Sequence, residues 1–343
     1  MRILLLGFGN VGRAFCELLH TRRKRLLDRF DLSPLLVGVA TRTRGCVSAD
    51  EGISIDRLLE FENRTGKIAE SVNSRGDHSD RSAAMVAEME YDLLVECTST
   101  NISSPGPATE HITVALQRGK HVVTSNKGPL LYGWKKLCDM AERNNARFLY
   151  EATVMAGTPF FSFIRECLKG ADVVSFEGVV NGTCNYMLEL MNQGSSLDEA
   201  LLDARRRGFT EPDPAFDIEG WDSAVKALIV AQAIMGYPPG NLSSAEVSGI
   251  RSVTSTMLRE ASRSGGAVRL IARVEKKPGG TRVSVGPEIV SCDSLLSRIR
   301  GASNGALLGT DSLGEILVAG GGAGPVRTAF ALMSDMVTAA VSR

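Results

Sequence analysis

The chain has 343 residues, which suits one large or two medium domains with an ample core. Lys plus Arg and Asp plus Glu both total 39, so the zero net charge gives no indication of a nucleic-acid or anionic-membrane partner. Apolar runs are shorter than the roughly 20 residues of a membrane span. An apolar strand begins near Ile3, and the seven scattered cysteines form no CxxC pair. We therefore expect a cytoplasmic protein with reduced thiols and no signal peptide.

The first residues have the pattern of a dinucleotide-binding unit. An apolar strand, residues 2–6, precedes the sequence GFGNVG and a helical pattern over 11–27. Such glycines allow a tight turn, close approach of a pyrophosphate, and close packing of helix on strand. The helix N-terminus then offers N–H groups to the phosphates. The alternative is a purely structural glycine turn. The predicted cofactor-binding residues of this turn are Gly7, Phe8, Gly9, Asn10, Val11 and Gly12.

The end of the second strand, residues 35–41, indicates which dinucleotide binds. NAD-selective sites usually carry an acid here, whereas this chain has Arg42 and Arg44. Because arginine pairs with a 2′-phosphate, we predict NADP as cofactor, held by these two arginines, with NAD as a possible second cofactor. The alternative is a pair of solvated loop arginines and use of both dinucleotides.

Further strands are predicted at 91–97, 121–124 and 147–151, with helices at 108–118 and 131–144 between them, while residues 45–90 show only a weak pattern. This alternation predicts an α/β fold with a Rossmann-type doubly wound parallel sheet. Lys127 follows a strand at the carboxyl edge, where such sheets bind ligands. A hydroxyl-rich turn after the strand at 91–97 either flanks the nicotinamide or only forms the turn. Its residues are Thr98, Ser99 and Thr100.

The regular alternation of strands and helices ends after Glu151, where helices mix with strand-like runs near 173–180, 268–274 and 283–285. We expect a second, α+β domain that binds substrate. The glycine run at 320–324 and Pro325 then open a last helix, 326–341, which returns to the nucleotide domain and brings Gly322 near the cofactor. The predicted domains are 1–150 plus 323–343 for the dinucleotide and 151–322 for the substrate.

A dense group of charged residues lies between 181 and 226. Two helical segments, 184–191 and 197–207, lead into a stiff EPDP turn, and an apolar helix follows. Asp222 and Lys226 are four residues apart in that helix and therefore share a face. Acids and a lysine arranged this way could grip an amino-bearing substrate, or they could form a solvated loop that caps a helix. The acids of the turn are Glu211, Asp213, Asp217 and Glu219.

Several stretches match one known family in order. They are GFGNVG at Gly7, HVVTSNKGPL at His121, EATVMAGTP at Glu151, NGTCNYML at Asn181, GFTEPDPAFDIEGWDSAVK at Gly208 and GGGAG at Gly320. On these stretches the chain resembles homoserine dehydrogenase over nearly its full length. The resemblance implies a homodimer that interconverts L-homoserine and L-aspartate 4-semialdehyde with NAD(P), on the route to threonine, isoleucine and methionine. The alternatives are a non-catalytic NADP-binding sensor and a Rossmann oxidoreductase for another small aldehyde.

The resemblance also implies roles for individual residues. Lys226 is expected to transfer the proton, with Asp222 beside it and Lys127 between cofactor and substrate. Many family members carry a regulatory extension, which we expect this chain to lack. The expected substrate-binding residues are Glu211, Asp217, Asp222, Asn181, Gly182 and Thr183. A segment like the family's loop for a monovalent cation such as sodium, with Met155 at a usually small position, contains Glu151, Val154, Ala156 and Thr158.

Overall fold

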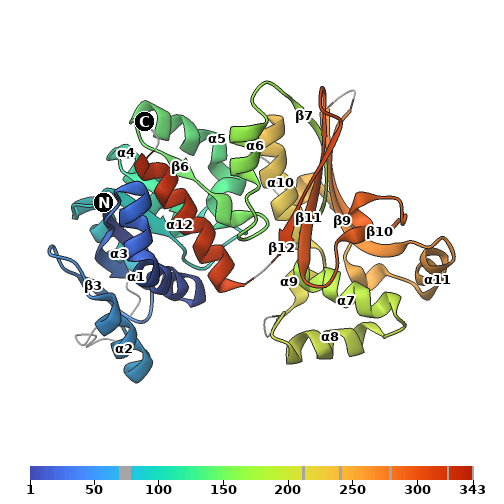
Figure 1. Ribbon diagram of the computed structural model, residues 1–343, viewed down its shortest axis with the longest axis horizontal. Helices are drawn as coiled ribbons and strands as arrows, with labels where there is room; N and C mark the ends of the chain where they lie inside the picture. The colour runs from blue at the N-terminus through green and yellow to red at the C-terminus, as the bar shows by residue number, and fades with distance from the viewer. Residues whose placement is uncertain (69–78, 211–212, 239–241, 278–279, 323, 342–343) are drawn as a thin grey trace. The chain divides into compact units, whose positions relative to one another are not determined.

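The computed structural model describes residues 1–68, 79–210, 213–238, 242–277, 280–322 and 324–341. The chain divides into two compact units, Met1–Thr153 with Gly324–Arg343, and Val154–Ala323. Each unit is built on its own six-stranded sheet (Figure 1). Within the described ranges, no helix is long and apolar enough to cross a membrane.

The sheet of the first unit is parallel except at one edge. Its strands are β1 (Arg2–Leu6), β2 (Leu35–Ala40), β3 (Cys46–Ser48), β4 (Leu93–Glu96), β5 (His121–Thr124) and β6 (Phe148–Leu149). They lie in the order β3-β2-β1-β4-β5-β6, and only β3 pairs antiparallel, with β2. The predicted Rossmann-type parallel sheet is therefore confirmed. The strand β3 was not predicted.

Helices pack on both faces of this sheet, because strand side chains alternate between the faces. Ile3 and Leu5 join a core with Phe15 and Leu332, on the face where α1 and α12 lie side by side (Figure 1). On the opposite face, α3 packs against β2 and α4, and α4 packs against α5. The helices of the unit are α1 (Asn10–Phe30), α2 (Ile55–Thr65), α3 (Ser79–Glu88), α4 (Gly106–Gln117), α5 (Lys127–Arg143) and α12 (Pro325–Val341), with a 3-10 turn η1 (Glu151–Thr153).

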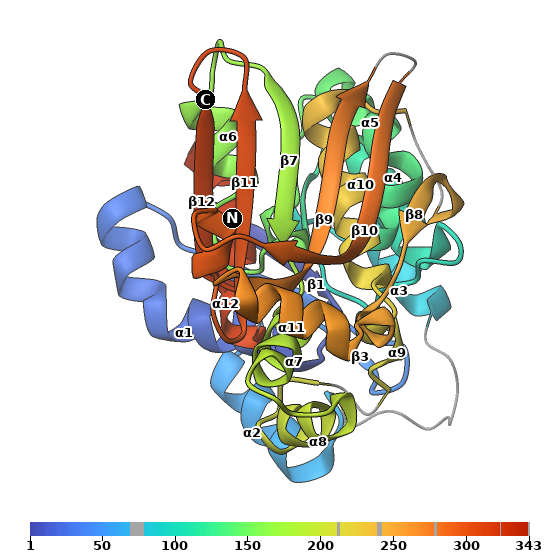
Figure 2. The ribbon, with the colours of Figure 1, turned by 90° about the vertical axis from the view of Figure 1, so that its right-hand side faces the viewer.

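The sheet of the second unit is mainly antiparallel, as expected for an α+β domain. Its strands are β7 (Val173–Val179), β8 (Ala245–Val247), β9 (Ala267–Lys277), β10 (Gly280–Val290), β11 (Ser303–Thr310) and β12 (Glu315–Gly321). Their order is β12-β11-β7-β9-β10-β8 (Figure 2), and only the short β8 pairs in parallel, with β10.

Three helices of the second unit, α7, α10 and α11, contact β9. Of these, α10 is buried along most of its length, as its apolar sequence predicts, so it forms a fixed support for any polar side chain on it. The helices are α6 (Phe161–Cys167), α7 (Gly182–Asn192), α8 (Leu197–Arg206), α9 (Ala215–Ile218), α10 (Trp221–Met235) and α11 (Ser255–Arg263), with 3-10 turns η2 (Leu242–Ser244), η3 (Ile250–Ser252) and η4 (Leu295–Arg298).

The glycine run before the last helix requires a correction. We expected residues 320–324 to open that helix, but Gly320 and Gly321 end strand β12. Gly320 faces the Thr158 hydroxyl so closely that an added Cβ would lie 2.2 Å from Thr158 Oγ1. The glycine at 320 is therefore explained by close packing within the second unit.

Candidate active site

In the glycine turn between β1 and α1, the fold requires glycine at Gly7 and Gly12 but not at Gly9. Gly7 has a left-handed φ of 92°, and an added Cβ would lie 2.4 Å from the Cys97 carbonyl oxygen. A Cβ at Gly12 would lie 2.2 Å from the Gly7 oxygen. At Gly9, the N-cap of α1, an added Cβ would meet nothing within 4 Å, and no side chain caps the helix. The space at Gly9 and the helix N-terminus behind it fit a bound pyrophosphate.

The turn's other predicted residues differ in exposure. Phe8 is buried, Val11 is half-buried and Asn10 is exposed. Arg44 lies against the turn, because it donates a hydrogen bond to the Phe8 carbonyl oxygen and its guanidinium carbon lies 5.9 Å from the centre of the Phe8 ring. Arg42 is exposed. Both predicted arginines thus belong to the loop after β2, and Arg44 contacts the glycine turn directly.

Glu62, which the sequence did not single out, pairs with Arg44. Its Oε1 lies 2.8 Å from Arg44 Nη1, and its other oxygen accepts from Arg13 Nη1. The Glu62 side chain is only 13% exposed, so the pair is poorly screened by solvent. This carboxylate reaches the loop from the helix α2, and no sequence motif marks Glu62. Glu62 neutralises part of the positive charge of Arg44, which we had expected to pair with a phosphate.

The carboxyl edge of the first sheet is organised by the buried carboxyl group of Glu96. It accepts hydrogen bonds from the Thr98 amide at 3.1 Å and from the hydroxyl groups of Thr98 and Thr124. Burial raises the pKa of Glu96 to about 7, although these hydrogen bonds act in the opposite direction. Thr98 therefore forms part of the turn after β4, which is the structural alternative we considered. Ser99 and Thr100 are exposed.

Lys127 is the first residue of α5, and its neighbour Asn126 fixes that helix start. Asn126 Oδ1 accepts from the Gly128 amide at 3.1 Å, while its Nδ2 donates to the Thr98 and Ser99 carbonyl oxygens at 3.3 and 3.4 Å. This side chain joins the turns after β4 and β5. The half-buried Lys127 is thereby placed beside the Thr98–Thr100 turn, at the edge where the sequence predicted it.

In the second unit, Lys226 and Asp222 form a nearly enclosed ion pair. Lys226 Nζ lies 2.6 Å from Asp222 Oδ2 and 2.6 Å from the Val180 carbonyl oxygen, and the two side chains are 11% and 9% exposed. The prediction that these residues share a helix face is confirmed. The same Val180 oxygen also accepts from Asn304 Nδ2 at 3.2 Å. Asn304, a second residue that no motif marked, therefore helps to fix the acceptor of Lys226.

Asn181 connects this ion pair to the acidic turn. Its Nδ2 donates to Asp217 Oδ1 at 2.7 Å and to Asp222 Oδ2 at 2.9 Å, while its Oδ1 caps α7 by accepting from the Cys184 amide. The predicted residues Gly182 and Thr183 follow in the first turn of α7, where Thr183 Oγ1 donates to a main-chain oxygen at 2.5 Å. The helix start thus brings together two carboxylates, one amide and one ammonium group.

Two acids of the EPDP turn do not join this group. Asp213 and Glu219 are exposed, and Asp213 Oδ1 only accepts from the Ala215 amide at 3.0 Å. Their expected part in gripping a substrate is therefore not supported, because both side chains face solvent. Glu211 lies outside the described residues.

The segment that resembles a cation loop has unusual backbone angles. Met155 and Ala156 have φ values of 62° and 51°, in the left-handed region that favours glycine. Val154 and Met155 are fully buried, and Thr158 is buried as well. Glu151, buried in the first unit, donates its amide to Asp335 Oδ2 at 2.8 Å. Among the described residues, no cluster of three or more His, Cys, Asp or Glu side chains could hold a metal ion.

Gly322 lies in the second unit. Its amide donates to the Ala302 carbonyl oxygen at 3.2 Å, and its own oxygen accepts from Asn304 Nδ2 at 3.1 Å. The close packing against Asn304 leaves no space for a Cβ, which would lie 2.2 Å from Asn304 Oδ1. The same asparagine therefore holds Gly322 and the Val180 oxygen that Lys226 contacts.

Comparison with known proteins covers both units. The family model described as "Homoserine dehydrogenase, NAD binding domain" matches residues 7–151, and "Homoserine dehydrogenase" matches residues 159–337. The homoserine dehydrogenase of Methanocaldococcus jannaschii is 33% identical over 98% of both chains. An NAD(+)-dependent homoserine dehydrogenase of Pseudomonas canavaninivorans is 33% identical over 98% of this chain and 95% of its own.

Solved structures agree with these matches. A putative homoserine dehydrogenase from Archaeoglobus fulgidus superposes with a TM-score of 0.88 and 33% identity over all of both chains. A hyperthermophilic archaeal homoserine dehydrogenase in complex with NADPH gives 0.82 and 32%, over 98% of this chain and 97% of its own. Since the matches in sequence and fold extend over both units, the chain belongs to the homoserine dehydrogenase family, the oxidoreductases that interconvert L-homoserine and L-aspartate 4-semialdehyde with a nicotinamide dinucleotide.

Proposed function

We propose that Lys226 gives a proton to the substrate oxygen during reduction and removes it during oxidation. The observation that carries this proposal is the enclosed ammonium group, whose Nζ has two acceptors at 2.6 Å, Asp222 Oδ2 and the Val180 oxygen. An ammonium group has three N–H donors. The third is left to donate to the oxygen atom of a bound substrate.

Reduction of the semialdehyde consumes one hydride and one proton. The hydride would come to the carbonyl carbon from a nicotinamide dinucleotide held by the first unit. As the C–O double bond is lost, the oxygen becomes alkoxide-like, and Lys226 stabilises this charge and delivers the proton. The neutral amine that remains is reprotonated by solvent. In the oxidation of L-homoserine the neutral amine of Lys226 takes the hydroxyl proton. Asp222 keeps the Lys226 amino group in position in both directions of the reaction.

The carboxylates around Asn181 are suited to the ammonium group of the substrate. Asp217 and Asp222 converge on the Asn181 amide, beside the ammonium group of Lys226. Two carboxylates this close together attract a positively charged group of a ligand. Gly182 and Thr183 would complete the substrate site, and Glu211 would add a third carboxylate.

The first unit has the residues to hold the cofactor. The space at Gly9 and the N-terminus of α1 would receive the pyrophosphate, and the Thr98–Thr100 turn with Lys127 would border the nicotinamide. We assign Lys127 a place between cofactor and substrate, and Gly322 a place near the cofactor, on the family resemblance.

Both dinucleotides occur among the relatives, one described as NAD(+)-dependent and one in complex with NADPH. We propose that this chain prefers NADP, with Arg42 and Arg44 as partners of the 2′-phosphate. Glu62 competes with the phosphate for Arg44, because the carboxylate already pairs with its guanidinium group at 2.8 Å. The preference is therefore expected to be weaker than two unpaired arginines would give.

Two further assignments rest on the family resemblance. A monovalent cation would be held by the segment with Glu151, Val154, Ala156 and Thr158, largely through main-chain oxygens. The left-handed backbone at Ala156 supports an unusual direction of the carbonyl groups in this segment. The second unit would also provide the surface through which two chains form a homodimer in the cytoplasm.

The experiment that tests substrate recognition compares L-homoserine with 4-hydroxybutanoate, which lacks the amino group, using NADP and NAD in parallel. We expect kcat/KM for 4-hydroxybutanoate to be lower by about 100-fold or more, because this compound brings no ammonium group to the carboxylates. Asp217→Asn should reduce this difference by slowing the reaction of L-homoserine alone. Equal turnover of both compounds would contradict the proposed role of the carboxylates and leave that of Lys226 in place.

A further inference from the structure

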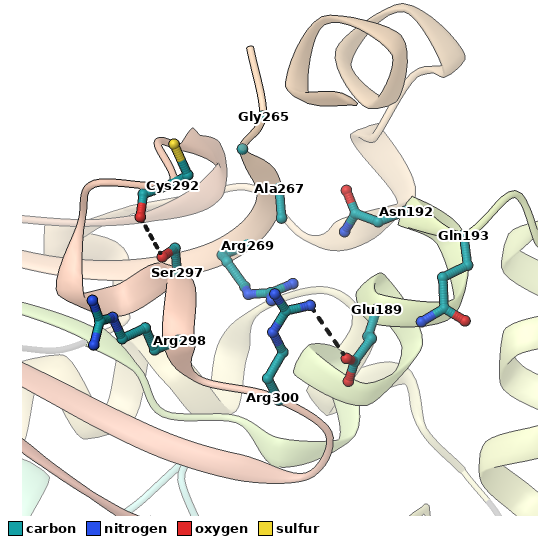
Figure 3. A pocket seen from close by; sticks show the side chains of 11 residues that line it. Glu189, Asn192, Gln193, Gly265, Ala267, Arg269, Cys292, Ser297, Arg298 and Arg300 are labelled. Carbon is teal, nitrogen blue, oxygen red and sulfur yellow. Dashed lines mark hydrogen bonds and ion pairs between the residues drawn. The ribbon is translucent and has the colours of Figure 1, made fainter. Parts of the chain in front are cut away.

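A cavity lies in the second unit, apart from the Lys226 group. Its volume is about 550 Å³, and it is lined by the carboxyl end of α7, the start of β9 and the segment around η4 (Figure 3). Asn181 lies at the opposite end of α7 from the cavity residue Glu189, eight residues or roughly 12 Å along the helix axis. The cavity is therefore distinct from the candidate active site.

The charge of the lining is strongly unbalanced. It contains the guanidinium groups of Arg269, Arg298 and Arg300 and the carboxylate of Glu189. That carboxylate already accepts from the Gly301 amide at 2.5 Å and lies 3.7 Å from Arg300 Nη1. The lining thus carries three positive groups and one acid, and the acid is engaged at the Arg300 side of the cavity.

Arg269 is the unusual member of this group, because it is only 1% exposed. Its Nη1 donates to the Val268 carbonyl oxygen at 3.4 Å, whereas Nε and Nη2 have no hydrogen-bond partner among the described residues. Figure 3 shows the guanidinium group in the cavity, beside that of Arg300. Burial lowers the pKa of Arg269 although Glu189 acts in the opposite direction. Buried charges are normally paired and hydrogen-bonded, so this group lacks a partner that its burial calls for.

The unpaired nitrogens are the two that form a binding edge. In a guanidinium group the Nε–H and Nη2–H bonds are parallel and match the two oxygens of a carboxylate or phosphate. The neighbouring amide of Asn192 does not compete for this edge, since it donates to the Leu188 and Val268 oxygens and accepts from the Val268 amide. The edge is thus arranged for a ligand with two acceptor oxygens.

We propose that this cavity binds a small oxyanion, a carboxylate or a phosphate, through Nε–H and Nη2–H of Arg269, with Arg298 and Arg300 at its rim. The site is a feature of the second unit and does not depend on the roles assigned to Lys226 or to the cofactor. A cavity of this volume also accommodates the organic part of a small carboxylate or phosphate ester.

Isothermal titration of the full-length protein with sodium phosphate and with sodium acetate, at constant ionic strength, tests the proposal. Saturating NADPH is present throughout, because the glycine turn of the first unit would otherwise bind phosphate. We expect one saturable site per chain, and a loss of affinity of about tenfold or more in Arg269→Met, which keeps an unbranched apolar stem but removes both donors. Binding of phosphate alone or acetate alone would identify which oxyanion the site takes.

The exposed Arg263, at the end of α11, provides a matched control. Arg263→Met should bind both anions as the wild type does. If Arg269→Met does not fold, Arg298→Gln with Arg300→Gln should still weaken binding several-fold by removing the rim charges. No binding to the wild type, or unchanged binding in these variants, would overturn the proposal. The wild type could instead bind no anion while Arg269→Met changes the mass measured by light scattering. In that case the partner of Arg269 would be a carboxylate of a second chain.

Discussion

At the scale of single residues, local geometry predicts the helical part of the candidate site, whereas Asn181 was expected there only from the family resemblance. Asp222 and Lys226 are four positions apart in one apolar helix, so their contact follows from local geometry. Asn181 is 36 residues from Asp217 and 41 from Asp222 in sequence, and only tertiary packing joins them. Asn304 is likewise brought to Val180 by a neighbouring strand.

Buried polar residues outside motifs were also missed. Glu96 lies inside an apolar run and Glu62 in a weakly patterned segment, so neither has a local signal of function. Their importance follows from burial and partners, which depend on the fold. Asn126 could have been found, because asparagine before a helix start is a common N-cap.

Glu96 leads to a prediction about stability and pH. Because burial raises its folded-state pKa to about 7, the folded protein keeps a proton between about pH 4.5 and 7 that the unfolded chain has released. The contribution of Glu96 to the free energy of unfolding therefore falls as pH rises through this window, by up to about 3 kcal/mol. Glu96→Gln should remove this decrease in chemical-denaturation curves measured from pH 5 to 8.

The exposed Glu110 of α4 is the control for this measurement. Glu110→Gln should keep the wild-type dependence on pH, since solvent screens its charge. If Glu96→Gln showed the same slope as the wild type, the Glu96 carboxyl would not be the group that titrates in this range.

At the scale of elements, strongly patterned segments were predicted well. The strand at 121–124 agrees with β5, and the helix predicted over 11–27 agrees with α1 within three residues at either end. Residues 45–90 gave little because the strand β3 has only three residues, too few to show a period, and the short helix α2 buries few side chains, with Leu58 as its buried residue. The strand β12 was missed because its final glycines were taken as part of the turn that opens the next helix.

The glycine turn allows a matched pair of substitutions. Gly12→Ala should lower the free energy of unfolding by about 2 kcal/mol or more, because its Cβ would lie 2.2 Å from the Gly7 oxygen. Gly9→Ala should change stability by less than about 1 kcal/mol, since its φ of −77° suits alanine and the space is open. It should nevertheless weaken NADPH binding by about tenfold or more, because the Cβ would enter the space proposed for the pyrophosphate.

Denaturant titration and the quenching of NADPH fluorescence separate the two effects. Equal losses of stability in both variants would contradict the assignment of Gly9 to ligand contact. Unchanged NADPH binding in Gly9→Ala would place the pyrophosphate elsewhere.

The contact between α2 and the loop after β2 predicts cofactor preference. Glu62→Gln should free the Arg44 guanidinium for a phosphate, and the affinity for NADPH should rise by about threefold to tenfold while that for NADH stays nearly constant. Arg42→Ala should act in the opposite direction by weakening NADPH more than NADH. Parallel changes for both dinucleotides in Glu62→Gln would show that Arg44 does not contact the 2′-phosphate.

At the scale of the whole molecule, the parallel sheet could be predicted because each of its parallel strands is followed by a helix before the next parallel strand. The strand order of the sheet in the second unit could not be predicted. There, β7 lies between β11 and β9, strands that follow it by about 90 residues or more, and pairing over such distances leaves no local trace in the sequence.

The proposed homodimer predicts a mass in solution near twice the 36.7 kDa of the chain. Obligate dimers show no change of mass on moderate dilution, so light scattering should give the same value over about a hundredfold range of concentration. A mass equal to that of one chain throughout the range would contradict the dimer.

Proton transfer by Lys226 is the central step of the proposed function. The decisive measurement is kcat for L-homoserine oxidation with NADP in Lys226→Ala, together with NADPH binding, and with the exposed Lys169→Ala as control. We predict a loss in kcat of about 100-fold or more in Lys226→Ala, with NADPH binding unchanged, and normal kinetics in Lys169→Ala. A kcat within a few-fold of the wild type in Lys226→Ala would contradict the assignment of Lys226 as the proton-transfer residue.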